Sequence, residues 1–257
     1  MRIVELAAIQ EVVTPATAFD AVRASMETLA AGGVNAPDEF AMHLRSGGEL
    51  HIKGAHLDGS DWIAAKVASG GFPGAPNAGC TMLINALSGA PEVILDDSGW
   101  LTEMRTAAAG AIASDTLGNP GPLRVAVLGT GAQARFQIEA LRARRDISAL
   151  AIWGRTVEKA QQLASELDAE AASTVEAAVA DVDVVVTCTS TRSPILDAVA
   201  AGTHITAMGS DVVGKRELGP AVLDAAAVIA ADDVSICASV GELQHEPSHI
   251  GRATTFL

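Results

Sequence analysis

Apolar and polar residues in the first part of the chain follow a mixed pattern, without a regular alternation of strands and helices. Apolar residues at helical spacing in 16–33 end at a Gly-Gly pair, which predicts a helix and its stop. Residues 70–79 are rich in Gly, Pro and Asn and predict a loop. Strands are predicted over 48–57, 62–69 and 90–101, the last ending in a turn.

A helix of small residues is predicted over 101–118, with Thr102 as its N-cap and Gly118 as its stop. The stretch GNPGP at 118–122 then interrupts the pattern. We place the boundary between two domains there.

After that boundary the pattern becomes regular, and strand-like runs alternate with amphipathic helices. Strands are predicted over 123–129, 149–155, 183–190, 203–210 and 226–232, and helices over 132–143, 156–169 and 174–182, with Thr156 as the cap of the second helix. Alternation at this spacing predicts a parallel sheet with helices on both faces.

The first turn of this second half reads Gly129-Thr130-Gly131-Ala132-Gln133-Ala134, a G-x-G-x-x-A pattern between a strand and a helix. Gly129 permits a tight turn, Gly131 lets backbone amides approach a pyrophosphate, and Ala134 allows close helix packing. The amides and dipole at the helix N-terminus favour phosphate. The pattern predicts a dinucleotide site; the alternative is an ordinary structural turn.

The end of the second strand reads Trp153-Gly154-Arg155-Thr156 and contains no carboxylate. A carboxylate there would favour NAD through the ribose hydroxyls, whereas a basic residue accommodates the 2′-phosphate of NADP. We therefore expect NAD(P) with NADP favoured, Arg155 and Thr156 binding the phosphate. Alternatively, Arg155 stacks on the adenine or points to solvent.

Composition narrows the function classes. The 257 residues are 49% hydrophobic and carry a net charge of −14, which argues against nucleic acid or an anionic membrane as a partner. No run of 18 apolar residues or signal-peptide layout is present. Three separated cysteines without a Cys/His cluster indicate free thiols in a cytoplasmic protein and predict no metal site. Because the chain has no tyrosine, a reductase that uses a Tyr–Lys pair is disfavoured.

Three charged residues stand out as candidate chemistry. Lys66 lies on an otherwise apolar strand, so it is either a snorkelling edge residue or aimed into a cleft. Arg105 lies among alanines, where burial would demand a partner, either a substrate anion or Asp96 or Asp97. Asp211 follows a buried strand whose end should line the ligand crevice, as an acid/base or as a cap.

Five stretches, in their order and spacing, resemble the ornithine cyclodeaminase/mu-crystallin family of NAD(P)-linked proteins. They are KVASGGFPG (66–74), LTEMRTAAAGAIA (101–113), VLGTGAQARFQIEAL (127–141), GSDVVGKREL (209–218) and GELQH (241–245). The resemblance covers about residues 35–245.

The resemblance implies an α/β fold with two domains. Residues 1–118 would form an α+β substrate-binding and dimerisation domain and residues 119–245 a Rossmann dinucleotide-binding domain, with the active site between them. Residues 246–257 would form a short C-terminal segment that returns towards the first domain. A homodimer is expected.

The resemblance also implies roles for individual residues. Lys66 and Arg105 match the family residues that hold the substrate carboxylate, and Asp211 matches the acid/base beside the substrate nitrogen. The expected cofactor site comprises Thr106, Gly129, Thr130, Gly131, Ala132, Gln133, Arg155, Thr156, Thr189, Ser190, Met208 and Gly209.

Within the family, the stretch H-x-K-G-A before KVASG is similar to the branch of ectoine-utilisation proteins and iminosuccinate reductases. His51 and Lys53 match it and would join the substrate site; alternatively, both are outward residues on one strand face. This branch implies an NAD(P)H-dependent reductase of a small α-imino acid. The alternatives are an ornithine cyclodeaminase-type lyase that recycles its NAD, and a non-catalytic NADPH-binding protein like the crystallin relatives.

Overall fold

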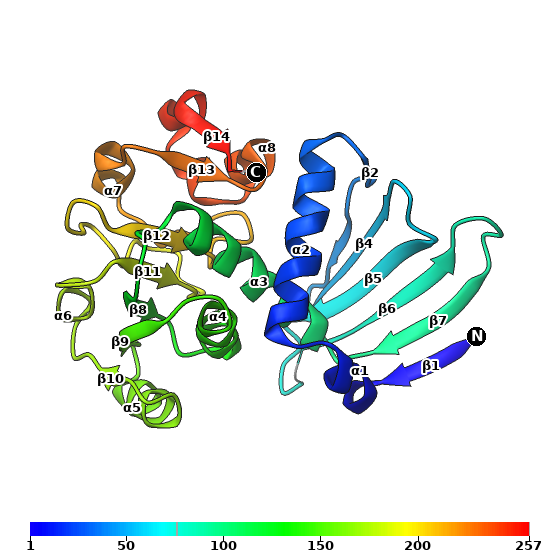
Figure 1. The fold of residues 1–257 in the computed structure, drawn as a ribbon, viewed down its shortest axis with the longest axis horizontal. Helices are drawn as coiled ribbons and strands as arrows, with labels where there is room; N and C mark the ends of the chain where they lie inside the picture. Colours follow the sequence, from blue (N-terminus) through cyan, green and yellow to red (C-terminus); the bar gives the residue numbers. More distant parts are fainter. Residues whose placement is uncertain (76, 257) are drawn as a thin grey trace. The chain divides into compact units, whose positions relative to one another are not determined.

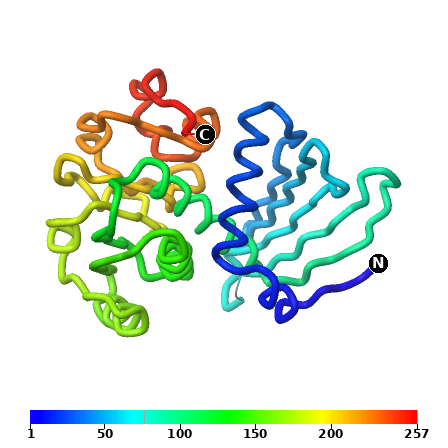
Figure 2. The backbone as a smooth tube through the Cα atoms, viewed as in Figure 1, coloured from blue at the N-terminus to red at the C-terminus, as the bar shows by residue number. Residues whose placement is uncertain are grey.

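A computed structural model describes residues 1–75 and 77–256. The chain divides into two compact units, Met1–Arg105 and Thr106–Leu257, and the boundary falls inside helix α3 (Trp100–Leu117) (Figures 1 and 2). The sequence placed this boundary at residue 118. It falls earlier because the first turn of α3 bonds within unit 1, where Asp97 accepts the Leu101 amide at 2.7 Å. The later turns bond within unit 2, where the Ser114 and Thr206 hydroxyls lie 2.9 Å apart.

Unit 1 is built on a seven-stranded sheet with two helices. Its elements are β1 (Arg2–Glu5), α1 (Leu6–Val12), α2 (Pro15–Ala30), β2 (Val34–Asn35), β3 (Phe40–His43), β4 (Glu49–Leu57), β5 (Trp62–Gly70), β6 (Ala78–Asn85) and β7 (Pro91–Asp96). The strand order is β1-β7-β6-β5-β4-β2, and β3 also pairs with β4. All pairs are antiparallel except β1 with β7. The sheet therefore brings β4 and β5 together with the start of α3.

The predicted elements of unit 1 are confirmed in kind, but the prediction omitted several strands. Strands β4, β5 and β7 and helix α2 correspond to predicted segments, whereas helix α1 and strands β1, β2, β3 and β6 were not predicted. The predicted loop over 70–79 ends early, because β6 begins at Ala78, and Pro76 lies outside the described residues. Helix α2 begins at a reciprocal capping box between Thr14 and Thr17, with a proline at its first position.

Unit 2 contains the predicted parallel sheet. Its elements are β8 (Leu123–Leu128), α4 (Ala132–Arg142), β9 (Ile147–Trp153), α5 (Val157–Glu166), β10 (Glu170–Ala171), α6 (Val175–Val179), β11 (Val184–Thr187), β12 (His204–Ala207), α7 (Pro220–Ala225), β13 (Ile229–Ala231), α8 (Val234–Ser239), the 3₁₀ helices η1 (Glu242–His245) and η2 (Pro247–Arg252), and β14 (Ala253–Thr255). The order β10-β9-β8-β11-β12 reverses between β8 and β11. Such a switch point is where parallel α/β sheets open a ligand crevice.

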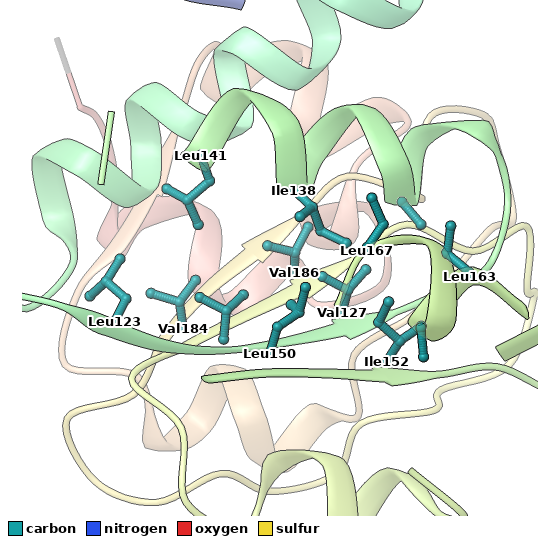
Figure 3. Close-up of a cluster of buried hydrophobic side chains, with 13 residues drawn as sticks. Leu123, Val127, Ile138, Leu141, Leu150, Ile152, Leu163, Leu167, Val184 and Val186 are labelled. Atoms are coloured by element: carbon teal, nitrogen blue, oxygen red, sulfur yellow. The ribbon is translucent and has the colours of Figure 1, made fainter. Parts of the chain in front are cut away.

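Side chains of β8 alternate between two apolar cores on opposite faces of this sheet. Val125 and Val127 pack with residues of α4 and α5, including Ile138 and Leu163, as Figure 3 shows for the labelled members of this cluster. Ala126 belongs to the other cluster, which includes residues of α6 and α7. Helices thus cover both faces, as the alternating pattern predicted.

One strand of the second half differs from the prediction. The predicted strand over 226–232 does not extend the five-stranded sheet, because β13 pairs with β14 in a separate two-stranded parallel sheet. In the segment 246–257, β14 pairs with β13 of the same unit, and Leu257 lies outside the described residues. The expected return of this segment towards the first domain stays a prediction. His249 is buried there and contacts Asp224 at 2.9 Å.

Candidate substrate and dinucleotide sites

The Gly-rich turn occupies the switch point of the parallel sheet. Gly129 follows β8 with φ +143°, and a Cβ there would lie 2.8 Å from the Cys188 carbonyl oxygen and Sγ at the end of β11. A glycine is therefore required for this close approach. Gly131 is the N-cap of α4 and makes no side-chain capping bond, while the space a Cβ would occupy on it is open. Thr130 and Ala132 flank it, so the first amides of the helix are available to an anion.

A buried amide links this helix to α3. The Gln137 Nε2 donates to the Thr106 carbonyl at 3.3 Å and to the Gln133 Oε1 at 3.1 Å. Thr106 and Gln133, which the resemblance assigned to the cofactor site, are thus held together by one residue that the sequence reasoning missed. Its only signal in the sequence was a polar residue on the apolar face of α4.

A groove lies beside the turn, lined by the first turn of α4 and by residues along the length of α5. It is lined by Thr130, Gly131, Ala132, Arg135, Lys159, Gln162, Leu163 and Glu166. Arg155 and Thr156 are exposed at the end of β9, and Thr156 is the N-cap of α5 but its hydroxyl makes no capping bond. Lys159, which was missed, lies in the first turn of α5, four residues after Arg155. The basic character of this groove suits an anionic group, although Arg135 pairs with Glu166.

The ends of β11 and β12 carry four more of the expected cofactor residues. Thr189 and Met208 are half-buried, Gly209 is buried, and Ser190 is exposed. Because parallel strands end at one edge of the sheet, these residues share the edge of the Gly-rich turn.

Asp211 is exposed on the loop that follows β12 and pairs with Lys215 at 2.5 Å. Its carboxylate therefore does not cap a helix, which was the alternative interpretation. The GELQH stretch (241–245) holds this loop through hydrogen bonds. The Gly214 amide donates to the Gln244 Oε1 at 2.8 Å, and the His245 Nε2 lies 2.7 Å from the Lys215 carbonyl oxygen.

In unit 1, Lys66 lies on an interior strand, directly opposite Lys53 on β4 and Thr81 on β6. The interpretation of Lys66 as an edge residue is therefore wrong. Its ammonium group donates to the Thr102 Oγ1 at 3.4 Å. Thr102 is not the N-cap of α3, because the helix already begins at Trp100. Burial, reinforced by the charges of Arg105 and Lys53, lowers the pKa of Lys66 to about 8.

Arg105 is exposed on α3, so the expectation that it is buried among alanines is wrong. The buried side of α3 is formed by its neighbours Met104, Ala107 and Ala108. The charge of Arg105 nevertheless acts on Lys66, which places both cations in one cluster of unit 1.

Glu39 joins the other two predicted residues of this unit. Its carboxylate contacts the Lys53 Nζ at 3.0 Å and the His51 Nδ1 at 2.5 Å. Burial acts to raise the pKa of Glu39, but the hydrogen bonds and charges of Lys53 and His51 hold it below its ordinary value. Sequence reasoning missed Glu39 because it lies in no predicted helix or strand and in none of the motifs.

The structure thus assembles two groups of residues, one in each unit. Lys53, Lys66 and Arg105 form a cationic cluster on unit 1, and the Gly-rich turn, the basic groove and the ends of β11 and β12 form an anion-binding edge on unit 2. Within residues 1–75 and 77–256, no three His, Cys, Asp or Glu side chains are arranged to hold a metal ion. None of the helices in these ranges is long and apolar enough to cross a membrane.

Comparisons with known proteins identify a family. The model of the ornithine cyclodeaminase/mu-crystallin family matches residues 2–253. A protein of Sinorhizobium fredii named as an uncharacterized cyclodeaminase is 37% identical over 226 residues, 82% of this chain and 68% of its own length. A second curated relative, also 37% identical, is spanned over only 64% of its length.

Two solved structures share the fold over nearly the whole chain. The iminosuccinate reductase of Paracoccus denitrificans in complex with NAD⁺ has a TM-score of 0.89 at 25% identity, covering 100% of this chain and 84% of that one. An archaeal alanine dehydrogenase dimer with bound NAD has a TM-score of 0.87 at 28% identity, covering 96% of this chain and 79% of that one.

Proposed function

Because the chain belongs to the ornithine cyclodeaminase/mu-crystallin family, we propose that it is an NAD(P)H-dependent reductase that converts a small α-imino acid to the amino acid. The observation that carries the proposal is the cationic cluster of Lys53, Lys66 and Arg105 on a protein with a net charge of −14. Glu39 pairs with Lys53, and lysine and arginine grouped in this way are the residue types that bind a carboxylate.

The substrate carboxylate binds Lys66 and Arg105. Arginine offers a fork of donors that can bind a carboxylate in a bidentate manner, and the lysine adds a compact charge. A second carboxylate, as in iminosuccinate, binds Lys53, with His51 beside it. Support for this dicarboxylate comes from the register, which puts Lys53 directly opposite Lys66.

The dinucleotide binds at the Gly-rich turn, with its pyrophosphate over the first amides of α4. We favour NADP, because Arg155, Thr156 and Lys159 supply hydroxyl and cationic groups and no carboxylate ends β9. Two of the related structures contain NAD⁺ or NAD. Titration of this chain with NADH and NADPH checks the preference, and NADPH is expected to bind more tightly.

The reduced cofactor, when bound, supplies the hydride for the imine carbon. Lys66 and Arg105 orient the substrate through its carboxylate, and this positioning supplies much of the rate. Asp211, or a water that it orients, acts as the acid/base that transfers the proton at the substrate nitrogen. Its ion pair with Lys215 keeps the carboxylate hydrogen-bonded until the substrate arrives.

The proposal is tested by supplying small 2-keto acids with ammonia or methylamine and either NADH or NADPH. Consumption of the reduced cofactor, followed by the absorbance of its nicotinamide band, is the expected result. Lys66→Ala and Arg105→Ala should weaken substrate capture while leaving cofactor binding intact. Unchanged turnover in both variants would remove these roles.

The same experiment separates the rival functions. Ammonia release from ornithine without net cofactor consumption would indicate a cyclodeaminase, the activity in the name of the Sinorhizobium fredii relative. Tight NADPH binding without either reaction would indicate a non-catalytic binding protein.

A further inference from the structure

Unit 2 contains a carboxylate that is completely buried at the carboxyl edge of the parallel sheet. Glu217 is 0% exposed, and within the described residues no cation lies within ion-pair distance of it. Moving a carboxylate out of water without compensation is costly, so its surroundings must replace the lost hydration.

The Glu217 carboxylate accepts four hydrogen bonds. The Thr187 hydroxyl and the Gly209 amide donate to Oε2 at 2.6 and 2.7 Å. The Thr189 amide and hydroxyl donate to Oε1 at 2.6 and 2.7 Å. A carboxylate accepts about four hydrogen bonds, so each acceptor position of Glu217 has one partner and none is left for a ligand.

These donors come from the ends of two neighbouring strands. Thr187 is the last residue of β11, Thr189 follows it, and Gly209 lies just after β12. A Cβ on Gly209 would collide with the Glu217 carboxylate and the Thr189 carbonyl. Glu217 therefore fixes the spacing and orientation of the segments that follow β11 and β12. Asp211 lies two residues after Gly209, in the second of these segments.

The backbone of Glu217 is itself held by the GELQH stretch. Glu242 accepts the Glu217 amide at 2.8 Å and the Leu218 amide at 3.1 Å. Burial raises the pKa of Glu242, although these amides act in the opposite direction. Glu242 thus holds the backbone of Glu217, and the Glu217 carboxylate in turn holds the ends of β11 and β12. The GELQH stretch is connected to the strand ends through these two residues.

A dinucleotide spans the switch point, with one mononucleotide on each half of the sheet. The Gly-rich turn and the end of β9 belong to the adenosine half, which leaves β11 and β12 for the nicotinamide half. We propose that Glu217 is a positioning residue that holds the nicotinamide half of the site in its binding geometry. This inference rests on the proposed dinucleotide function, but it concerns a residue that the ligand never touches.

Glu217→Gln tests the proposal, because glutamine keeps the shape and turns one acceptor oxygen into a donor that opposes an amide or a hydroxyl. Two ligands are titrated: the reduced dinucleotide that the wild type binds more tightly, and ADP-ribose with the same 2′ substituent. ADP-ribose lacks the nicotinamide and reports the adenosine half alone. Ser114→Ala is the matched control, since it breaks a buried hydrogen bond to β12 that involves neither Glu217 nor any of its four donors.

We expect Glu217→Gln to weaken dinucleotide binding about tenfold, as for the loss of a buried hydrogen-bond partner, and to leave ADP-ribose binding within about twofold. Thr187→Val, which removes one donor without changing shape, should shift the same ratio less and serves if Glu217→Gln fails to fold. Ser114→Ala should leave the ratio unchanged. Equal losses for both ligands, or an unchanged ratio in the glutamate and threonine variants, would overturn the positioning role. A wild type that binds no dinucleotide would instead overturn the proposed function.

Discussion

At the scale of single residues, Lys66 shows how one side chain can be costly for stability and useful for binding. It is half-buried on an interior strand, next to a second lysine and near Arg105. Burial, the largest cause, lowers its pKa from 10.5 to about 8, so the folded state disfavours the charged form that neutral pH imposes. A bound carboxylate would relieve that penalty.

Lys66→Met should therefore raise the melting temperature at pH 7 while lowering kcat/KM about 10- to 100-fold, as for the loss of a charged hydrogen bond. The penalty on charged Lys66 is fully present below the folded pKa of about 8 and disappears as pH rises towards the unfolded value of 10.5. The stability gain should shrink over that window, which thermal unfolding at several pH values measures. Lys53→Met, on the more exposed neighbour, should give no comparable gain. A less stable Lys66→Met protein at pH 7 would contradict this account.

At the scale of elements, the register between β4 and β5 decides which charges meet. Lys53 pairs with Lys66, and His51 pairs with Ala68 on the same face of the sheet. A one-residue slip would send Lys53 to the opposite face. The segment before β3 then adds Glu39, which holds Lys53 and His51.

Glu39→Gln should free Lys53 for a second substrate carboxylate. We expect kcat/KM for a dicarboxylic imine, from oxaloacetate and ammonia, to rise about two- to fivefold relative to the imine from pyruvate, since a partly exposed ion pair contributes roughly 0.2–1 kcal/mol. Glu49→Gln is the control, because Glu49 contacts His43 and His51. A ratio that stays constant or falls would show that Glu39 instead holds Lys53 ready for substrate.

At the scale of the whole molecule, one sheet face of unit 1 is apolar and open to solvent. Ile3, Phe40, Met42 and Ile52 are 61%, 53%, 43% and 36% exposed. The register puts all four on the face opposite Lys53 and Lys66. Phe40, Met42 and Ile52 lie on the paired strands β3 and β4, whereas Ile3 lies on β1 at the other end of the strand order. Large exposed apolar patches mark interfaces, and the archaeal alanine dehydrogenase with this fold is a dimer. We propose that a second copy of the chain covers this face.

Sedimentation velocity should give a mass twice the 26.1 kDa of the chain. Ile52→Glu together with Phe40→Glu should yield monomers, because the charges would be buried without partners. Val213→Glu is the control, since Val213 is an apolar residue of unit 2 that is 69% exposed. A monomeric wild type, or a double variant that remains dimeric, would rule out this face.

The sequence by itself determined the parallel sheet of unit 2, the Gly-rich turn between β8 and α4, and the family. These features depend on local periodicity and on glycines at set positions, which adjacent residues specify. The local sequence also singled out Lys66, Arg105 and Asp211, and the resemblance assigned their roles, but neither showed which side chains surround them.

Only the tertiary structure decided those surroundings. The exposure of Arg105, the pairing of Glu39 with Lys53, the separate pairing of β13 with β14 and the burial of Glu217 all depend on how distant segments meet. Glu217 contacts Thr187, a residue 30 positions away. Neither periodicity nor charge along the chain encodes such a contact, because hydrogen bonds and burial depend on distances in space that the order of residues does not contain.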